Sequence, residues 1–406
     1  MIKKIFYGWR IVLGCSLIAF YVAGVIAFGF TAFFKPIAKE MGWSYTQISL
    51  AASIRGLEMG MFAPIFGYLV DRFGPRRLIF WGVLTIGFGL VFISQTNSLT
   101  MFYAAFGILA LGRSACSVTV LTTAVAKWFR RNLGKALGIL SSGMGASGVL
   151  VVLIVWLIDL YQWRTTFVIL GLGMWLLGIP LSFLIRDRPE QYGYDLNGET
   201  SAEQVLATRI QDAEAGFKQV LKSSTFWHLT LAQTIQRMII ITVITHIMPY
   251  LSSVGMSRSG AAIVATSIPL LSILGRFGFG WLGDIFDKRH MMAWSYSCIG
   301  AGLLALSYVQ ESWVIYPFLM FFPLSWGSMA LSGAIVREYF GTASFGKILG
   351  VMGGIGTIGV IIGPSVAGWT YDTLGSYQLI WLIFTATSVV PVALILTIKP
   401  RREQAG

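Results

Sequence analysis

Five charged residues lie within segments that are otherwise apolar: Arg55, Glu58, Arg113, Arg237 and Arg276. An ionised side chain at the centre of a membrane helix costs about 2.5–3.5 kcal/mol on insertion scales, so these residues must face water, each other or a ligand. Arg55 and Glu58 are three residues apart and can pair on one helix, which leaves an excess of positive charge. Because guanidinium groups bind carboxylates through two parallel hydrogen bonds, this excess predicts an anionic ligand.

Arg276 is the strongest candidate for contact with that ligand. It stands in the run "PLLSILGRFGFGWLGD", residues 269–284, with Ser272 one helical turn earlier on the same face. The alternative is snorkelling, because Arg276 lies only about 9 Å from the expected cytoplasmic end of its helix. We predict that Arg276 binds the substrate and that Ser272 belongs to the same site.

Arg113 lies in the middle of "FGILALGRSACS", residues 106–117, too deep to snorkel easily. It is either a second anion contact, which favours a two-ended substrate such as a dicarboxylate, or a structural partner of Glu58. Tyr21 and Trp326 are candidates for shaping the pocket, although an aromatic residue in such a chain is more often in the core or against lipid. All three are therefore candidate binding residues with a structural alternative.

His246 and Arg237 are nine residues apart on one predicted helix, which places them on opposite faces. Only one of them can then point into a given cavity. If it is His246, the titration of imidazole near neutral pH makes it a candidate proton carrier, with Glu58 as the second candidate. The alternative for His246 is a hydrogen-bonded position near the outer end of the helix, and Arg237 is then expected to pack against another helix or the linker.

The composition is that of a membrane protein, with 56% hydrophobic residues, 12% charged residues and a mean hydropathy of +0.73. Apolar stretches of about 20 residues recur, each long enough to cross a bilayer as a helix, and backbone groups in lipid must be satisfied within the segment. We therefore predict an all-α membrane protein. Its twelve transmembrane helices are expected near residues 11–34, 46–69, 78–95, 100–126, 135–158, 164–185, 226–252, 259–282, 291–309, 313–336, 346–370 and 377–398.

The two halves of the chain repeat each other. "GYLVDRFGPRR" begins at Gly67 and "GWLGDIFDKRH" at Gly280, an offset of 213, while "LGKALGI" at Leu133 and "FGKILGV" at Phe345 are 212 apart. A polar connector lies between the halves. The sequence thus predicts two pseudo-symmetric six-helix bundles, residues 1–185 and 225–406, joined by a cytoplasmic linker, residues 186–224.

The repeated loop carries charges that can act as a gating latch. Asp71 lies beside Arg72 just beyond its predicted helix, and a carboxylate there can hold basic partners or accept hydrogen bonds from helix N-terminal amides. Such a contact ties neighbouring helices together in one state and breaks in another; the alternative is that these charges only set topology and turns. The residues assigned to the latch are Gly67, Asp71, Arg72, Gly74, Arg76, Gly280 and Asp284.

Basic residues orient the predicted helices. With both termini in the cytoplasm, 22 of the 30 lysines and arginines lie inside, and those outside are Lys35, Lys39, Arg164 and Arg258. The net charge of +13 is therefore a topology signal, and we expect no nucleic-acid partner. The prediction is a multi-pass protein of a plasma membrane, the bacterial inner membrane, that works as a monomer in the lipid bilayer.

Several chemistries are excluded by what the sequence lacks. The three cysteines and three histidines are scattered, which argues against a disulfide framework or a metal site. We find no nucleophile–base set and no phosphate-binding loop, so we expect neither an enzyme nor transport driven by ATP, and no cofactor.

The loop at residues 67–77 resembles the signature of the major facilitator superfamily, and its second copy is degenerate because Asp287 stands where a glycine would. "YGWRIV" (from Tyr7), "FFKPIAKEMGWSYTQIS" (from Phe33), "RDRPEQYG" (from Arg186) and "GPSVAGWTYDTLGSY" (from Gly363) are similar to the monocarboxylate transporter and oxalate/formate antiporter branch. The resemblance implies the major facilitator fold, with a substrate site between two six-helix bundles.

The resemblance also implies roles for single residues. In monocarboxylate transporters an arginine of the eighth helix binds the substrate carboxylate, and Arg276 falls at that place. His246 aligns with a cavity histidine of some bacterial members, which favours it over Arg237. Animal members carry an aspartate and a lysine where this chain has Ser272 and Phe28, so a side-chain carboxylate relay is not implied.

The sequence therefore predicts a secondary transporter of small organic anions that works by alternating access. The expected substrate is a lactate-like monocarboxylate, carried with a proton and bound at Arg276. An exchanger of dicarboxylates or other organic anions is the alternative, which the additional arginines favour. A membrane sensor that binds an anion without transporting it is the third alternative.

Overall fold

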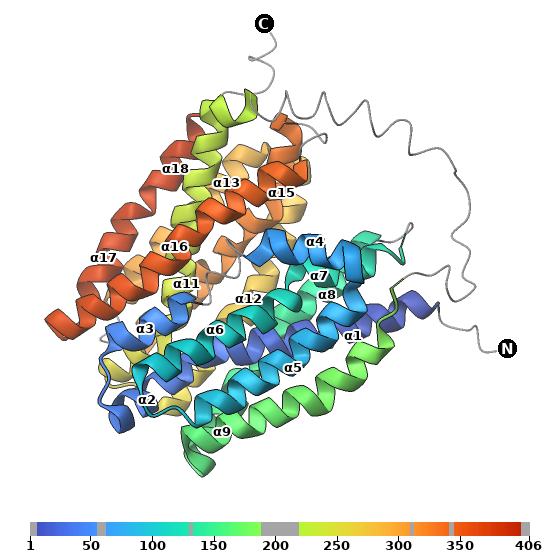
Figure 1. The fold of residues 1–406 in the computed structure, drawn as a ribbon. Helices are drawn as coiled ribbons and strands as arrows, with labels where there is room; N and C mark the ends of the chain where they lie inside the picture. Colours follow the sequence, from blue (N-terminus) through green and yellow to red (C-terminus); the bar gives the residue numbers. More distant parts are fainter. Residues whose placement is uncertain are drawn as a thin grey trace, which may run out of the picture. The chain divides into compact units, whose positions relative to one another are not determined.

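The computed structural model of the protein describes residues 6–54, 62–129, 133–187, 219–308, 312–340 and 345–398, and every regular element in these ranges is a helix (Figure 1). The α-helices of the first half are α1 (Tyr7–Val22), α2 (Phe34–Met41), α3 (Tyr45–Ile54), α4 (Ala63–Phe73), α5 (Pro75–Ser94), α6 (Leu99–Ala115), α7 (Val118–Ala126), α8 (Leu133–Ala146) and α9 (Val149–Leu184). Those of the second half are α11 (Ser224–Ser253), α12 (Arg258–Ile285), α13 (Lys288–Ser307), α14 (Ile315–Phe321), α15 (Gly327–Phe340), α16 (Phe345–Leu374), α17 (Gln378–Thr387) and α18 (Val389–Leu396). The predicted all-α class is confirmed.

Within the described ranges, nine helical segments are long and apolar enough to cross a membrane. One of them, Lys135–Leu184, contains the fifth predicted span and all but the last residue of the sixth. The predicted span at 46–69 corresponds to α3 and α4, and that at 291–309 to α13. The helices are consistent with twelve crossings, because the described residues of each predicted span lie largely in helix.

The chain forms two compact units. Unit 1 comprises Met1–Leu196, Val243–Leu270 and Pro364–Asp372, and unit 2 comprises Asn197–Thr242, Leu271–Gly363 and Thr373–Gly406. Parts of α11, α12 and α16 thus belong to unit 1, while the remainder of these helices belongs to unit 2. The division at residues 186–224 into two six-helix bundles stays a prediction.

The first part of unit 1 is one long helical segment that runs from Tyr7 to Met41. It begins with α1, passes through a π-helical turn η1 (Ala23–Phe28) and a 3₁₀ turn η2 (Gly29–Phe33), and ends with α2 at Gly42, whose φ of +67° suits glycine. Lys35 and Lys39 lie on its last turns.

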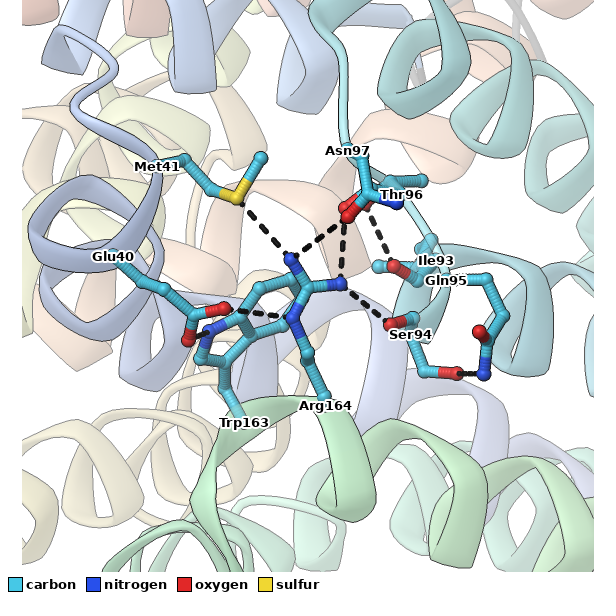
Figure 2. Close-up of polar contacts among 9 residues, drawn as sticks. All are labelled: Glu40, Met41, Ile93, Ser94, Gln95, Thr96, Asn97, Trp163 and Arg164. Atoms are coloured by element: carbon cyan, nitrogen blue, oxygen red, sulfur yellow. Dashed lines mark hydrogen bonds and ion pairs between the residues drawn. The ribbon is translucent and has the colours of Figure 1, made fainter.

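The break between the fifth and sixth predicted spans falls at Gln162, where φ of 64° and ψ of 167° interrupt α9. Just after it, Arg164 donates from Nε to Glu40 Oε1 at 2.7 Å and from Nη1 to the carbonyls of Ser94 and Thr96 at 2.7 and 2.9 Å (Figure 2). A cation at a helix C-terminus satisfies carbonyls that have no partner within the helix. Arg164 therefore fixes the second part of α9 to the end of α5.

The first repeated loop joins α4 to α5 through Gly74, whose φ is +82°. The amide of Arg76, in the first turn of α5, donates to Asp187 Oδ1 at 2.9 Å, so an acid from the segment after α9 caps this helix. A Cβ atom on Gly74 would lie 2.5 Å from the same Asp187 Oδ1. The loop thus needs glycine both for its backbone angle and for the approach of the carboxylate.

In the second repeated loop, the acid that caps the following helix belongs to the loop itself. Asp287 and Arg289 are the counterparts of Gly74 and Arg76 at the offset of 213, and Asp287 Oδ1 accepts from the Arg289 amide at 2.8 Å. The Arg289 guanidinium forms an ion pair with Asp287 at 2.6 Å, and this hydrogen bond holds the pKa of the Asp287 carboxyl below its usual value. The residue that makes the second copy degenerate is therefore the cap of α13.

We predict that Gly74→Ala destabilises the protein by about 1–3 kcal/mol, because alanine is strained at positive φ and its methyl group displaces Asp187. Gly67→Ala is the matched control in the same loop motif, since nothing lies within 4 Å of a Cβ placed there. In thermal unfolding measured in detergent, the midpoint temperature should fall for Gly74→Ala and should stay the same or rise for Gly67→Ala. Equal midpoints for the two variants would contradict this account.

Candidate functional site

His246, on α11, is buried where α2, α3, α11 and α16 pack together within unit 1. Its side chain is fully buried, and Nε2 lies 2.9 Å from the Pro364 carbonyl oxygen and 3.1 Å from Ser49 Oγ. Since a carbonyl only accepts, Nε2 must carry the hydrogen; Ser49 Oγ donates its own hydrogen to the Tyr45 carbonyl at 2.6 Å. The imidazole also lies against Phe34, with ring centres 5.1 Å apart. His246 therefore holds several helices together.

Asp372, in the last turn of α16, caps the start of α3 in the same contact. Its Oδ1 accepts from the Tyr45 amide at 3.0 Å, and its Oδ2 accepts from the amide and the hydroxyl of Thr46 at 2.7 and 2.5 Å. The rings of Tyr45 and Tyr371 stack with centres 4.7 Å apart. An acid is favourable at a helix N-terminus, where four amides lack partners within the helix. We call the Asp372 and His246 interactions together the α3–α16 closure.

A cavity of about 660 Å³ lies in unit 1 beside this closure. Thr31 and Met248 line it and are joined by a hydrogen bond of 3.1 Å from the Met248 amide to Thr31 Oγ1. Its lining also includes Lys35, Lys39 and Arg258. None of these residues was assigned to a site from the sequence, although three of the basic residues predicted to lie outside are among them.

Tyr21 and Arg113 also belong to unit 1. Tyr21 donates its hydroxyl hydrogen to the Leu170 carbonyl at 2.7 Å, so the hydroxyl joins α1 to α9. Arg113 is half-buried in the last turn of α6 and lines a small cavity of about 40 Å³, together with Cys116 and Met144. Their contact with a substrate stays a prediction.

Arg276, Ser272 and Trp326 belong to unit 2. Arg276 is half-buried on α12, and among the residues that the structure describes no carboxylate oxygen lies within 4 Å of its guanidinium. Ser272 is fully buried one turn earlier on the same helix. Trp326, in η6 (Phe322–Trp326), is buried against the ring of Phe322 at 5.7 Å. Arg276 is thus a cation on a spanning helix without an acidic partner in the described ranges.

Arg237 is a second such cation in unit 2. Its Nη1 atom is buried and has no hydrogen-bond partner among the described residues, and a Cβ placed on Gly356 of α16 would lie 2.9 Å from that atom. The neighbouring side chain is satisfied, because Gln236 donates from Nε2 to the Ser325 carbonyl at 2.9 Å and to Ser328 Oγ. The guanidinium of Arg237 therefore packs on a glycine surface of α16 while leaving hydrogen-bonding capacity unused.

The predicted intramembrane pair, Arg55 and Glu58, lies outside the described residues, and so does the side chain of Asp71. Arg72 and Asp284 are exposed at the ends of α4 and α12. The remaining residues assigned to the latch are Gly67, Gly74, Arg76 and Gly280; of these, Gly74 and Arg76 meet Asp187, as described above. The gating role of the set stays a prediction.

The conspicuous sequence stretches contact each other in unit 1. Tyr45 belongs to "FFKPIAKEMGWSYTQIS" and meets Tyr371 and Asp372 of "GPSVAGWTYDTLGSY". At the other end of the helical segment 7–41, the ring of Tyr7 from "YGWRIV" lies 4.1 Å below the guanidinium of Arg186 from "RDRPEQYG". Asp372 and Asp187 were missed as functional candidates, although the stretches that contain them were recognised.

Comparison with known proteins gives a consistent picture. The family model described as Major Facilitator Superfamily matches residues 12–328 and, in a second match, residues 231–406. Monocarboxylate transporter 12 of Xenopus laevis is 26% identical over 402 residues, covering 93% of this chain and 85% of the relative. Monocarboxylate transporter 13 of Bos taurus is 25% identical over 397 residues, covering 96% and 87%.

Solved structures agree on the fold. A bacterial homologue of the human lysosomal transporter Spinster, inward-facing and unoccupied, has a TM-score of 0.75 at 18% identity, covering 97% of this chain and 95% of that one. A variant of the nucleoside transporter NupG has a TM-score of 0.75 at 13% identity, covering 96% and 100%. These likenesses confirm the predicted fold class.

Two arginines allow a test of how charge is held in this protein. Arg164→Met should destabilise the protein by about 1–3 kcal/mol, because Glu40 and the α5 carbonyls lose a charged donor. Arg237→Met should stabilise it by about 1 kcal/mol, because methionine fills similar space without burying an unsatisfied cation. Thermal unfolding in detergent without added anions shows whether each substitution lowers or raises the stability of the protein. A lower midpoint for Arg237→Met would mean that its guanidinium is satisfied in the folded protein.

Proposed function

Because this chain belongs to the Major Facilitator Superfamily, we propose that it is a secondary transporter of small organic anions, with a lactate-like monocarboxylate as substrate and a proton as the coupled ion. Its relatives are membrane transporters rather than enzymes. The observation that carries the substrate class is Arg276, a half-buried cation with no carboxylate partner in the described ranges. A cation held in this way is stabilised when a carboxylate binds it.

The α3–α16 closure supports transport by alternating access. It joins α3, which follows the first spanning segment, to segments of α11 and α16 through single hydrogen bonds and one acid on a helix N-terminus. Contacts of this kind break at small cost when water replaces the partner. In the proposed cycle the closure seals one side, and the loops at Gly74 and Asp287 act at the opposite ends of the adjoining helices.

The orientation of this cycle follows from the charge distribution. In the proposed orientation, which the excess of basic residues on one side supports, both termini lie in the cytoplasm and the α3–α16 closure lies on the outer side of a bacterial inner membrane. An organic anion then enters from outside when the closure opens. The protein works as a monomer, since one chain supplies both the closure and Arg276.

A dicarboxylate exchanger is the second candidate. Arg237 favours it, because its buried Nη1, which has no hydrogen-bond partner among the described residues, provides a contact in unit 2 for a second carboxylate. The two candidates differ in what drives uptake. A proton symporter takes up lactate when the outside is acidic, whereas an exchanger requires anion already inside the vesicle.

We expect Arg276→Gln to weaken lactate binding by about 10- to 100-fold, the effect of losing a charged hydrogen-bonding partner. Lys222→Gln, which removes an exposed positive charge, is the control and should behave as wild type. Binding is measured by thermal shift and transport by uptake of labelled lactate into liposomes, with and without preloaded malate. Saturable binding without flux would favour the sensor, and unchanged binding by Arg276→Gln would overturn its assignment.

Proton coupling predicts a separate effect at His246. His246→Gln should keep lactate exchange between equal pH values but lose most of the stimulation by external acid, because the titratable group is gone. His228→Gln is the matched control on the same helix, where His228 Nδ1 lies 3.2 Å from Thr397 Oγ1. Uptake is followed at external pH values between about 5.5 and 7.5. Full acid stimulation in His246→Gln would assign the proton elsewhere.

A further inference from the structure

The cavity beside the α3–α16 closure collects the basic residues that the sequence places outside. Lys35, Lys39 and Arg258 line it, and the fourth, Arg164, binds Glu40, which also lines it. Basic residues are scarce on the outer side of membrane proteins, so their gathering at a single cavity calls for a physical reason.

Two of the four positive charges are neutralised by fixed partners. Arg258 forms an ion pair of 2.6 Å with Asp159 and donates to the Ala32 carbonyl at 3.4 Å. Arg164 pairs with Glu40 at 2.7 Å, and Trp163 Nε1 holds the second oxygen of that carboxylate at 2.6 Å. These pairs shape the rim of the cavity and contribute no net charge to it.

The other two charges belong to Lys35 and Lys39, which have no acidic partner in the part of the chain that the structure describes. Lys35 and Lys39 are exposed, and neither has an ion pair within 4 Å among the described residues. They are four residues apart on α2, so they lie on the same face, where like charges repel each other. Counted over the described residues, the cavity therefore has an excess of two positive charges, which a ligand or solvent ions can balance.

The size and position of the cavity suit a small solute. Its volume of about 660 Å³ lies within the range of pockets that take small molecules. The hydrogen bond between Thr31 and Met248 lies at its wall, and both residues adjoin the helices of the α3–α16 closure. Met256 and Pro249 add apolar wall next to polar Ser252 and Gln162. Such a lining suits an organic acid that has a carboxylate at one end and an apolar carbon chain at the other.

We propose that this cavity is an entry site for organic anions, in which Lys35 and Lys39 hold the substrate carboxylate while the α3–α16 closure is shut. The inference deepens the proposed function and depends on its orientation. The two lysines raise the local concentration of anions at the gate, and their effect is electrostatic, so salt weakens it. Because both remain hydrated, they hold the anion loosely and release it when the closure opens.

The charge of the cavity can be measured without transport. Ser252→Cys places a thiol in the cavity wall, in a Cys298→Ser background because Cys15 and Cys116 are buried. An anionic thiosulfonate should label this thiol faster than a cationic one of the same size. Lys35→Gln with Lys39→Gln should lower the ratio of the two rates by about five- to tenfold at low salt.

Conservative substitution separates charge from shape in the same experiment. Lys35→Arg with Lys39→Arg should keep the ratio of labelling rates, and lactate should protect the thiol in both charged forms. An unchanged ratio in the glutamine variant overturns the proposal. Failure of lactate to protect the thiol in the wild-type lysine background also overturns it, because the two lysines would then hold no carboxylate.

Transport by the same variants tests the consequence for function. With lactate outside, the glutamine variant should raise KM by about three- to tenfold and leave kcat unchanged, and about 0.5 M salt should remove most of the difference. The arginine variant should match wild type. If wild type carries no organic anion, the proposed function fails; if wild type transports and KM is equal in both variants, only the entry site fails.

Discussion

The structure depends on how it compensates charge in an apolar chain. Arg164 satisfies its guanidinium with Glu40 and two helix-end carbonyls, and Asp372 places its carboxylate on the free amides of α3. Where the described residues leave a cation of a spanning helix without an acid, as at Arg237 and Arg276, the free energy cost of holding that cation is not offset by an ion pair. A ligand of opposite charge removes that cost, which is why the substrate class can be argued from unpaired arginines.

The two ends of unit 1 use the same device to hold helices together. At one end Asp187 caps α5, and at the other Asp372 caps α3. Each carboxylate comes from a segment distant in the sequence, and each bonds backbone amides that water can serve equally well. A helix cap of this kind fixes the positions of the two segments while they are in contact, and it opposes their separation with only a small free energy. This property suits contacts that form and break in a transport cycle better than a buried apolar interface would.

Much of the fold could be predicted from the sequence, because apolar length and basic connectors determine where helices begin and end. The break at Gln162 falls in a connector recognised by its polarity, and the offset of 213 correctly pairs Gly74 with Asp287. The identity of the acid on each loop could not be predicted. Helical periodicity places residues on a face of their own helix, but it does not say which distant segment covers that face. Asp187 therefore went unassigned.

The same limit of sequence-based prediction applies to the candidate site, where contacts between distant helices determine what each ionisable residue does. The sequence identified Arg276 and His246 as ionisable groups in spanning helices, and their chemistry alone sufficed for that. It could not show that His246 donates to the Pro364 carbonyl, since the helices involved are more than 100 residues apart.

The proposed entry site adds a difference in solvation to this picture. In the proposed cycle, an anion bound at Lys35 and Lys39 gains little because these side chains are exposed and water screens them, whereas the half-buried guanidinium of Arg276 binds it more strongly. A transported ion must be bound well enough to enter and loosely enough to leave. Weak cations outside the closure and a stronger one on a spanning helix meet both conditions, because the anion exchanges quickly with solvent at the first and displaces water only at the second.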